Sequence, residues 1–149
     1  MGKLWEQLGQ DLVTAMKAKD ALTLSVLRMA KAAMTHLAIE KKKDVLDDAE
    51  IIDVLSKQLK QRKESYEAFT QGGRTELAQK EQSEMAILEK YLPKQLDTSE
   101  LEILIKQAIK DSGAQSKADM GKLMGVLMPK IKGRADGKIV NQMIQSFLV

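Results

Sequence analysis

Apolar residues recur at intervals of three and four positions along nearly the whole chain, and this spacing is the strongest constraint on the fold. The series begins with Trp5, Leu8 and Leu12 and resumes after each interruption. Such spacing gathers apolar side chains on one face of an α-helix. Strand-like alternation is nearly absent, and Ala, Leu, Lys, Glu, Gln and Met, which favour helices, are plentiful. The sequence therefore predicts an all-α protein.

Glycine and proline divide this helical pattern into segments. Gly72, Gly73 and Gly113 are typical helix stops, and the residue before Pro93 avoids the helical region, so a helix should end near Leu92. Residues suited to cap the following helices are Asp47 or Asp48, Asp97, Ser116 and Asp136. We expect an N-terminal domain of about four helices over residues 1–92, a linker at 93–96, and a small three-helix domain over residues 97–149.

Charged residues inside two of the expected helices indicate which side of each helix faces the solvent. Arg62 interrupts an apolar series in the third helix, and we expect its stem to lie on the core while its head stays in water. Glu81, Glu84 and Glu89 share the fourth helix with lysines, so we expect them to form a solvated face. His36 with Glu40 supplies too few ligands for a metal site, and we expect a partly exposed helical histidine.

Several classes of function lack their residues in this chain of 149 residues. There is no cysteine, and neither the P-loop nor the dinucleotide-binding glycine pattern occurs. We expect no catalytic residue, no metal and no cofactor. No apolar run approaches the roughly 20 residues that span a bilayer, and the first residues lack the apolar core of a secretory signal. We therefore expect a cytoplasmic protein without a membrane partner.

Positive charge is concentrated in the last quarter of the chain. Residues 113–149 contain six basic and two acidic residues, a net charge of +4, while the whole chain carries +3. The preceding residues therefore sum to −1. A basic segment of this kind indicates a polyanionic partner.

The run from Gly121 to Lys138, GKLMGVLMPKIKGRADGK, admits two compatible interpretations. In the first, Gly121 and Gly125 allow a second helix to approach closely, Pro129 kinks or ends the helix, and Gly133 is its left-handed stop. In the second, the cations converge beside the free N–H groups of the last helix and contact a phosphate backbone. The candidate RNA-binding residues are Lys122, Lys130, Lys132, Arg134 and Lys138.

Two motifs make the chain resemble the YqeY family. They are ILEKYLPKQL, which contains Pro93, and MGKLMGVLMPKIKGRADG, and the resemblance extends over essentially the whole chain. The C-terminal part is also similar to the tail domain of GatB, a subunit of the glutamine-dependent tRNA amidotransferase. Gly121, Gly125, Lys130 and Gly133 fit that tail pattern, whereas Pro129 departs from it.

The resemblance implies a two-domain helical protein whose small domain is similar to a tRNA-contacting module. It implies no catalysis, because the catalytic parts of the amidotransferase lie in other domains and subunits. Our first hypothesis is a non-catalytic accessory protein that contacts tRNA or other structured RNA. One alternative is a participant in glutamine-dependent amide transfer on aminoacyl-tRNA, a carbon–nitrogen ligase activity. Another is a helical protein-interaction module, suggested by Tyr66, Phe69 and the Met-rich stripe.

Overall fold

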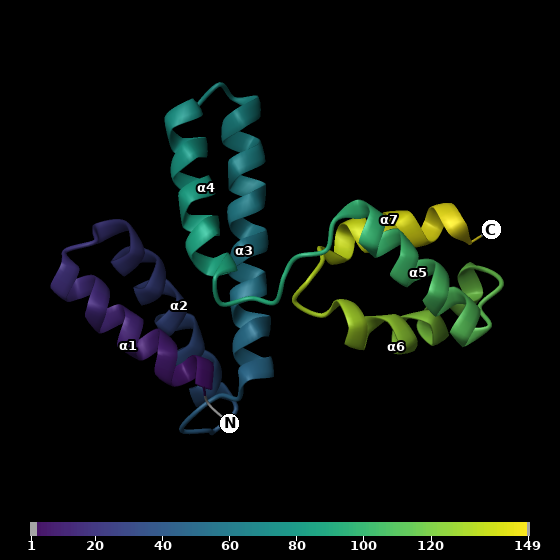
Figure 1. Cartoon of the computed structure of the whole chain (residues 1–149), viewed down its shortest axis with the longest axis horizontal. Coiled ribbons are helices and arrows are strands. Elements are labelled where there is room, and N and C mark those ends of the chain that lie inside the picture. The colour runs from purple at the N-terminus through teal and green to yellow at the C-terminus, as the bar shows by residue number, and fades with distance from the viewer. Residues whose placement is uncertain (1–2, 149) are drawn as a thin grey trace. The chain divides into compact units, whose positions relative to one another are not determined.

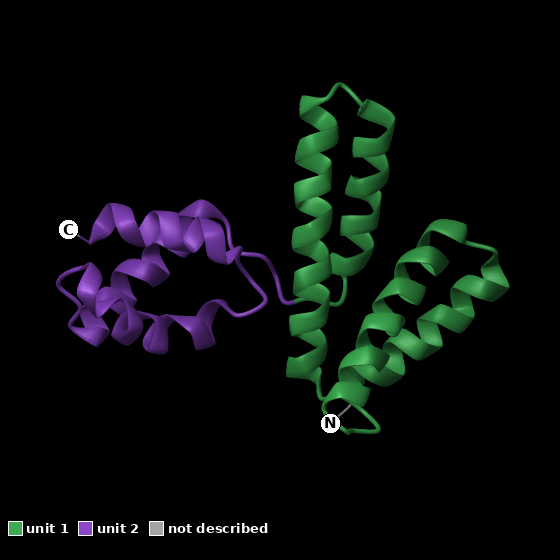
Figure 2. Cartoon of the chain, turned by 180° about the vertical axis from the view of Figure 1, so that it is seen from behind, with its two compact units in different colours: residues 1–92 green, residues 93–149 purple. Residues whose placement is uncertain are grey.

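A computed structural model describes residues 3–148 and confirms the all-α fold class (Figure 1). Within these residues the chain forms seven α-helices and one short 3₁₀ helix, and no strand. The helices gather into two compact units, residues 1–92 and residues 93–149 (Figure 2).

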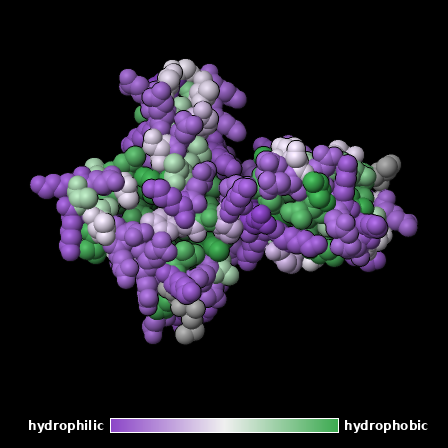
Figure 3. Space-filling view, viewed as in Figure 1, coloured by the Kyte–Doolittle hydropathy of each residue, from purple (hydrophilic) through white to green (hydrophobic). Residues whose placement is uncertain are grey.

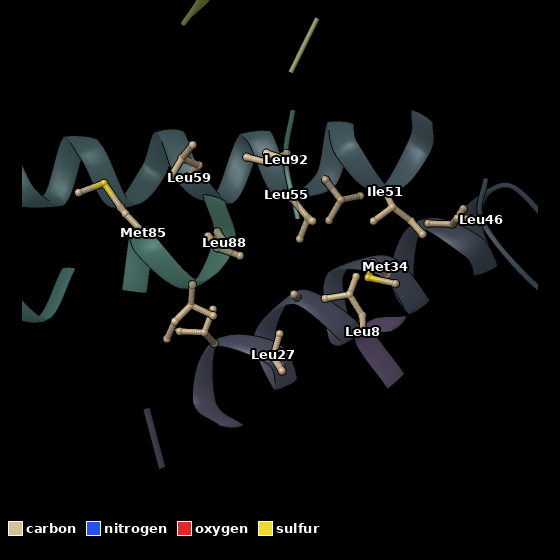
Figure 4. Packing of buried hydrophobic residues seen from close by; sticks show 14 of the residues in the cluster. Leu8, Leu27, Met34, Leu46, Ile51, Leu55, Leu59, Met85, Leu88 and Leu92 are labelled. Atoms are coloured by element: carbon tan, nitrogen blue, oxygen red, sulfur yellow. The ribbon is translucent and has the colours of Figure 1, made fainter. Parts of the chain in front are cut away.

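Unit 1 consists of two helical hairpins that share one apolar core. The helices are α1 (Lys3–Ala18), α2 (Ala21–Glu40), α3 (Asp48–Gln71) and α4 (Thr75–Glu89). In Figure 1, α1 lies beside α2, and α3 lies beside α4. Figure 4 shows side chains from all four helices pointing toward one another, including the buried Leu27, Met34, Leu55 and Leu88. The apolar residues that recur every three or four positions thus form a single core in this unit.

A capping box between Asp47 and Glu50 fixes the start of α3, together with the ion pairs of Glu50 with Lys41 and Lys43, which we call the clasp. Asp47 accepts a hydrogen bond from the backbone N–H of Glu50 at 2.8 Å, and Glu50 accepts one from the N–H of Asp47 at 3.0 Å. The carboxylate of Glu50 also receives Lys41 Nζ at 2.6 Å and Lys43 Nζ at 2.8 Å. These bonds to the charged form hold the pKa of Glu50 at about 2. The lysines that follow α2 are thereby tied to the first turn of α3.

The buried charges of unit 1 correct two expectations. The head of Arg62 does not reach water: the residue is 7% exposed, and its Nε lies 3.5 Å from Glu84 Oε2. Glu84 is 8% exposed and so does not belong to a solvated face. Arg62 Nη2 also lies 3.7 Å from Met29 Sδ, which places the pair among α2, α3 and α4. Neither charge could stay in this core without the other.

The end of α4 differs from the sequence expectation by a few residues. The helix ends at Glu89 rather than near Leu92, and Pro93 lies beyond it. Tyr91 and Leu92 turn back onto the core of unit 1 instead of extending the helix. The Tyr91 hydroxyl donates a 2.6 Å hydrogen bond to Asp11 of α1. Burial and this anionic partner raise the pKa of Tyr91, so the phenol stays protonated and keeps donating.

Unit 2 packs its helices around a second, smaller core. They are α5 (Thr98–Ser112), the 3₁₀ helix η1 (Lys117–Asp119), α6 (Met120–Ile131) and α7 (Gly137–Phe147). The core contains Leu101, Ile105, Leu123, Leu127, Val140 and Ile144. Gly113, with a φ of +72°, ends α5 in the left-handed conformation expected of a helix stop. Asp97 caps α5 by accepting the N–H of Glu100 at 2.8 Å.

Candidate nucleic-acid interface

The outward face of α6 carries the two glycines of the basic stretch. Leu123, Leu127 and Ile131 face the core of unit 2, so the opposite side of the helix holds Gly121, Gly125 and the 43%-exposed Met128. A Cβ atom placed on either glycine would meet nothing within 4 Å. The expectation that these glycines admit a second helix is therefore wrong for this unit. They face outward because the three large aliphatic residues already fill the inner side.

Pro129 lies within α6 and does not end it. The helix continues to Ile131, and the Lys132 N–H still donates to the Met128 carbonyl at 3.0 Å. Having no N–H, Pro129 cannot donate to the carbonyl of Gly125 four residues earlier. Pro129 is itself exposed, so the loss of this bond falls on the solvent side of the helix. The outward face thus combines two positions without side chains and a carbonyl without its usual helical partner.

The turn after α6 is held by the segment that enters unit 2. Gly133 has a φ of +74°, as expected of a left-handed stop. Gln95 Nε2 donates to its carbonyl at 2.8 Å, and the Leu96 N–H donates to the carbonyl of Arg134 at 2.8 Å. The expected linker residues 93–96 are therefore bonded to the turn between α6 and α7. No feature of the sequence marks this pairing, because Gln95 and Gly133 are 38 residues apart.

Arg134 differs from the other four candidate RNA-binding residues in its surroundings. Its Nε donates to the Lys94 carbonyl at 3.2 Å, and its Nη1 lies 3.5 Å from the Lys130 carbonyl. The side chain is only partly exposed. Arg134 thus holds together the entering segment, the end of α6 and the turn. Its spacing among other cations in the sequence gave no sign of this structural task.

The four candidate lysines are all exposed, although their neighbours differ. Lys122 lies on the outward side of α6, one position after Gly121. Lys130 lies at the edge toward α5, where its Nζ is 3.7 Å from Asp111 Oδ2. Lys132 follows the last turn of α6, and Lys138 lies in the first turn of α7. The structure thus places three of the four on α6 or at its end.

The N-terminus of α7 is not an open anion site. Asp136 Oδ1 accepts the N–H of Lys138 at 2.9 Å, so the protein supplies its own anion to this helix start. A phosphate would have to approach beside that carboxylate. The capping residue already occupies one of the N–H groups that were expected to be free beside the cations.

Two other kinds of feature were sought among the described residues: a metal centre and a membrane-spanning helix. Among them no group of three or more His, Asp or Glu side chains is placed to hold a metal ion. His36 is exposed on α2. None of the helices within residues 3–148 has both the length and the apolar character needed to cross a bilayer.

Comparison with known proteins decides the family. The family described as Yqey-like protein matches residues 5–148. This chain belongs to the YqeY family. One curated relative of this YqeY protein is named "Altered inheritance of mitochondria protein 41, mitochondrial" and comes from Pyrenophora tritici-repentis. It is 32% identical over 143 residues, and the match covers 93% of this chain and 77% of the relative. The protein of the same name from Saccharomyces cerevisiae (strain YJM789) is 32% identical over 120 residues, covering 77% of this chain and 65% of the relative.

These relatives correct the expected location of the YqeY protein. They are named as mitochondrial proteins, which contradicts the cytoplasmic location expected from the sequence. That expectation rested on the absence of an apolar secretory segment. Mitochondrial targeting uses amphipathic, arginine-rich segments instead, so the criterion does not distinguish the two compartments.

Proposed function

We propose that this YqeY protein is a non-catalytic accessory protein that binds structured RNA, with tRNA as the first candidate, through the outward face of α6. The observation that carries the proposal is the exposed pair Gly121 and Gly125 with Lys122 beside them. Because no side chain projects from either glycine, a sugar-phosphate backbone can come close to the helix there. Lysine then neutralises the phosphates that approach.

The cations divide into contacting and positioning residues. Lys122, Lys132 and Lys138 are the proposed phosphate contacts, being exposed on α6, just after it, and at the start of α7. Lys130 Nζ lies 3.7 Å from Asp111 Oδ2 of α5, and Lys130 is left unchanged in the test below. Arg134 positions the turn through its bonds to the Lys94 and Lys130 carbonyls. This division refines the set of five expected from the sequence.

Two further observations support an RNA partner. Residues 113–149 carry a net charge of +4, while residues 1–112 sum to −1. The same residues resemble the tail domain of GatB, a module that contacts tRNA. Unit 2 offers no exposed aromatic ring to stack on bases in the positions named, so binding should depend on shape and phosphate charge rather than on base sequence.

The test compares two triple variants that remove the same charge. Lys122→Ala/Lys132→Ala/Lys138→Ala alters the proposed surface, and Lys17→Ala/Lys57→Ala/Lys60→Ala removes three exposed lysines from unit 1. With a tRNA probe, we expect only the first triple to weaken binding and to reduce the log–log salt slope by about 2 to 3. Equal losses of tRNA affinity in the two triple variants would show that binding depends only on the overall charge of the protein. No loss of affinity in the first triple variant would overturn the proposal.

A single substitution tests the glycine face apart from charge. In Gly125→Leu the new side chain enters open space, so unit 2 should fold at least as well as before. Its bulk should hold an RNA backbone away and weaken tRNA binding. Lys57→Leu on α3 is the control for an added exposed apolar group. Unchanged affinity in Gly125→Leu would remove α6 from the interface.

Amide transfer is tested in the same preparation. Purified protein is incubated with glutamine, ATP and Glu-tRNA, alone and with an amidotransferase core. We expect no product from the protein alone and no gain in rate with the core. Product formation by the protein would replace the accessory role with the carbon–nitrogen ligase alternative.

A further inference from the structure

Unit 1 has a long groove between α1 and α2 that the proposed RNA contact does not use. Two hollows of about 590 Å³ and about 510 Å³ meet at Lys31, which lines both. Trp5, Gly9 and Val13 of α1 line the first hollow, while Leu12 of α1 and Ile39 of α2 line the second. Figure 3 shows apolar surface interspersed with hydrophilic side chains over these two helices.

The groove exposes large apolar side chains at helical spacing. Val13 is 48% exposed, Met16 next to the groove is 51% exposed, and Ile39 is 71% exposed. Gly9 leaves the wall low between Trp5 and Val13, so a rod-shaped partner can lie deep in the groove. A stripe from Trp5 to Met16 is about 16 Å long, which matches about three turns of a helix laid along it. This is the pattern of a helix-in-groove site.

The rim of the groove is basic. Arg28, Lys31 and His36 line the second hollow without any acidic residue, and Glu6 is the single acid that lines the first. Among residues 3–148 no ion pair engages Arg28 or Lys31. Both side chains are exposed on the same side of α2, three residues apart. Their charge is therefore available to a partner.

We propose that the α1–α2 groove binds an amphipathic helix of a partner protein, with an apolar stripe flanked by acidic residues. The stripe would lie on Trp5, Val13 and Ile39, and the acids would face Arg28 and Lys31. A nucleic acid fits the rim but leaves the apolar floor in water. A second copy packed symmetrically would set the same predominantly basic rim against itself. Charge complementarity thus favours a distinct, acidic partner.

Trp5 makes the groove directly observable, because it is the only tryptophan in the chain. The probe is a tryptophan-free helical peptide of about 16 residues with Leu in an i, i+3, i+4, i+7 stripe and Glu on both flanks. One comparison peptide replaces every Glu by Lys, and another keeps the composition but scrambles the stripe. With the full-length protein, we expect a saturable change in Trp5 emission with the acidic peptide and at least about tenfold weaker binding of the other two.

Variants then assign the contacts. Arg28→Glu/Lys31→Glu should weaken binding of the acidic peptide by about tenfold or more and strengthen binding of the lysine peptide. Lys57→Glu/Lys60→Glu, which makes the same charge change on exposed positions of α3, should affect neither peptide by more than about twofold at moderate salt. Val13→Ser/Ile39→Ser should weaken binding, whereas Ile103→Ser/Ile139→Ser, at exposed positions of unit 2, should not.

Several outcomes would overturn the proposal. Equal binding of the acidic, basic and scrambled peptides would show that the groove does not recognise this class of helix. A concentration-dependent dimer in light scattering that Val13→Ser/Ile39→Ser abolishes would make a second copy the occupant. A Trp5 response to tRNA that Arg28→Glu/Lys31→Glu abolishes would assign the groove to nucleic acid. The substitutions that test the tRNA contact lie in unit 2 and those that test the groove lie in unit 1, so failure of either proposal leaves the other standing.

Discussion

In unit 1, polar side chains join helices to one another, whereas the cations on the outward side of α6 in unit 2 contribute nothing visible to its core. Arg62 pairs with Glu84 across α3 and α4, and Tyr91 donates to Asp11 of α1. In unit 2 the long-range polar contacts concentrate at the turn after α6, where Gln95 bonds to Gly133. The difference separates charge that joins helices within the fold from charge that lies exposed on the surface.

The largest effect should follow from breaking the buried pair of unit 1. Arg62→Ala leaves Glu84 buried without its partner, and we expect a loss of about 3–5 kcal/mol in the free energy of unfolding. Trp5 fluorescence during denaturant unfolding reports on unit 1 alone, since the only tryptophan lies there. The double variant Arg62→Met/Glu84→Leu should recover most of the loss. A loss below about 1 kcal/mol in Arg62→Ala would instead match a surface pair and erase this contrast between the units.

The clasp at Glu50 should give unit 1 an acid-sensitive contribution. The folded-state pKa of about 2 lies below the ordinary value of 4.5, so the contribution is present above about pH 4.5 and is lost as the pH falls toward 2. In Glu50→Gln we expect a lower Tm at neutral pH and a flatter decline of Tm between pH 5 and 2. Glu64→Gln, at an exposed position of the same helix, serves as the control and should retain the wild-type pH profile. Identical profiles for both variants would show that the clasp does not stabilise unit 1.

The smallest effect should be a gain in unit 2. Gly125→Ala adds a methyl group in open space within a helix, and we expect about 0.5–1 kcal/mol of added stability in thermal unfolding followed by circular dichroism. Gly133→Ala should lower stability, because its φ of +74° disfavours any side chain. If Gly125→Ala also lowered stability, Gly125 would be required for the packing of unit 2. The outward face of α6 would then no longer be an open surface at this position.

Local patterns predicted much of the helical structure because they act over a few residues. The 3-4 apolar spacing indicated the helices, and Asp47, Asp97 and Asp136 cap helices as expected. The end of α4 was less predictable. Pro93 sets only an outer limit, and the packing of Tyr91 and Leu92 on the core ends the helix earlier.

The candidate site was predicted only as a set of residue types. The sequence indicated where glycines and cations occur, but it assigned Gly121 and Gly125 to an internal contact that the structure does not contain. It also placed Arg134 among the contacts, although its guanidinium bonds to the Lys94 carbonyl. The misplaced glycines and the unforeseen bonds of Arg134 have one cause: a residue's surroundings include segments up to about 40 positions away, and spacing along the chain carries no record of them.

The sequence by itself determined the helical class, most of the helix starts and stops, the excess of positive charge after Gly113 and the membership of the YqeY family. Only the tertiary structure decided which charged side chains along the chain face outward and which are buried. Helix formation depends on neighbours within one or two turns, whereas the exposure of Arg62 or Gly125 depends on which distant helix packs against that side. That is why the sequence predicted the helices, whereas the two proposed binding surfaces became apparent only in the tertiary structure.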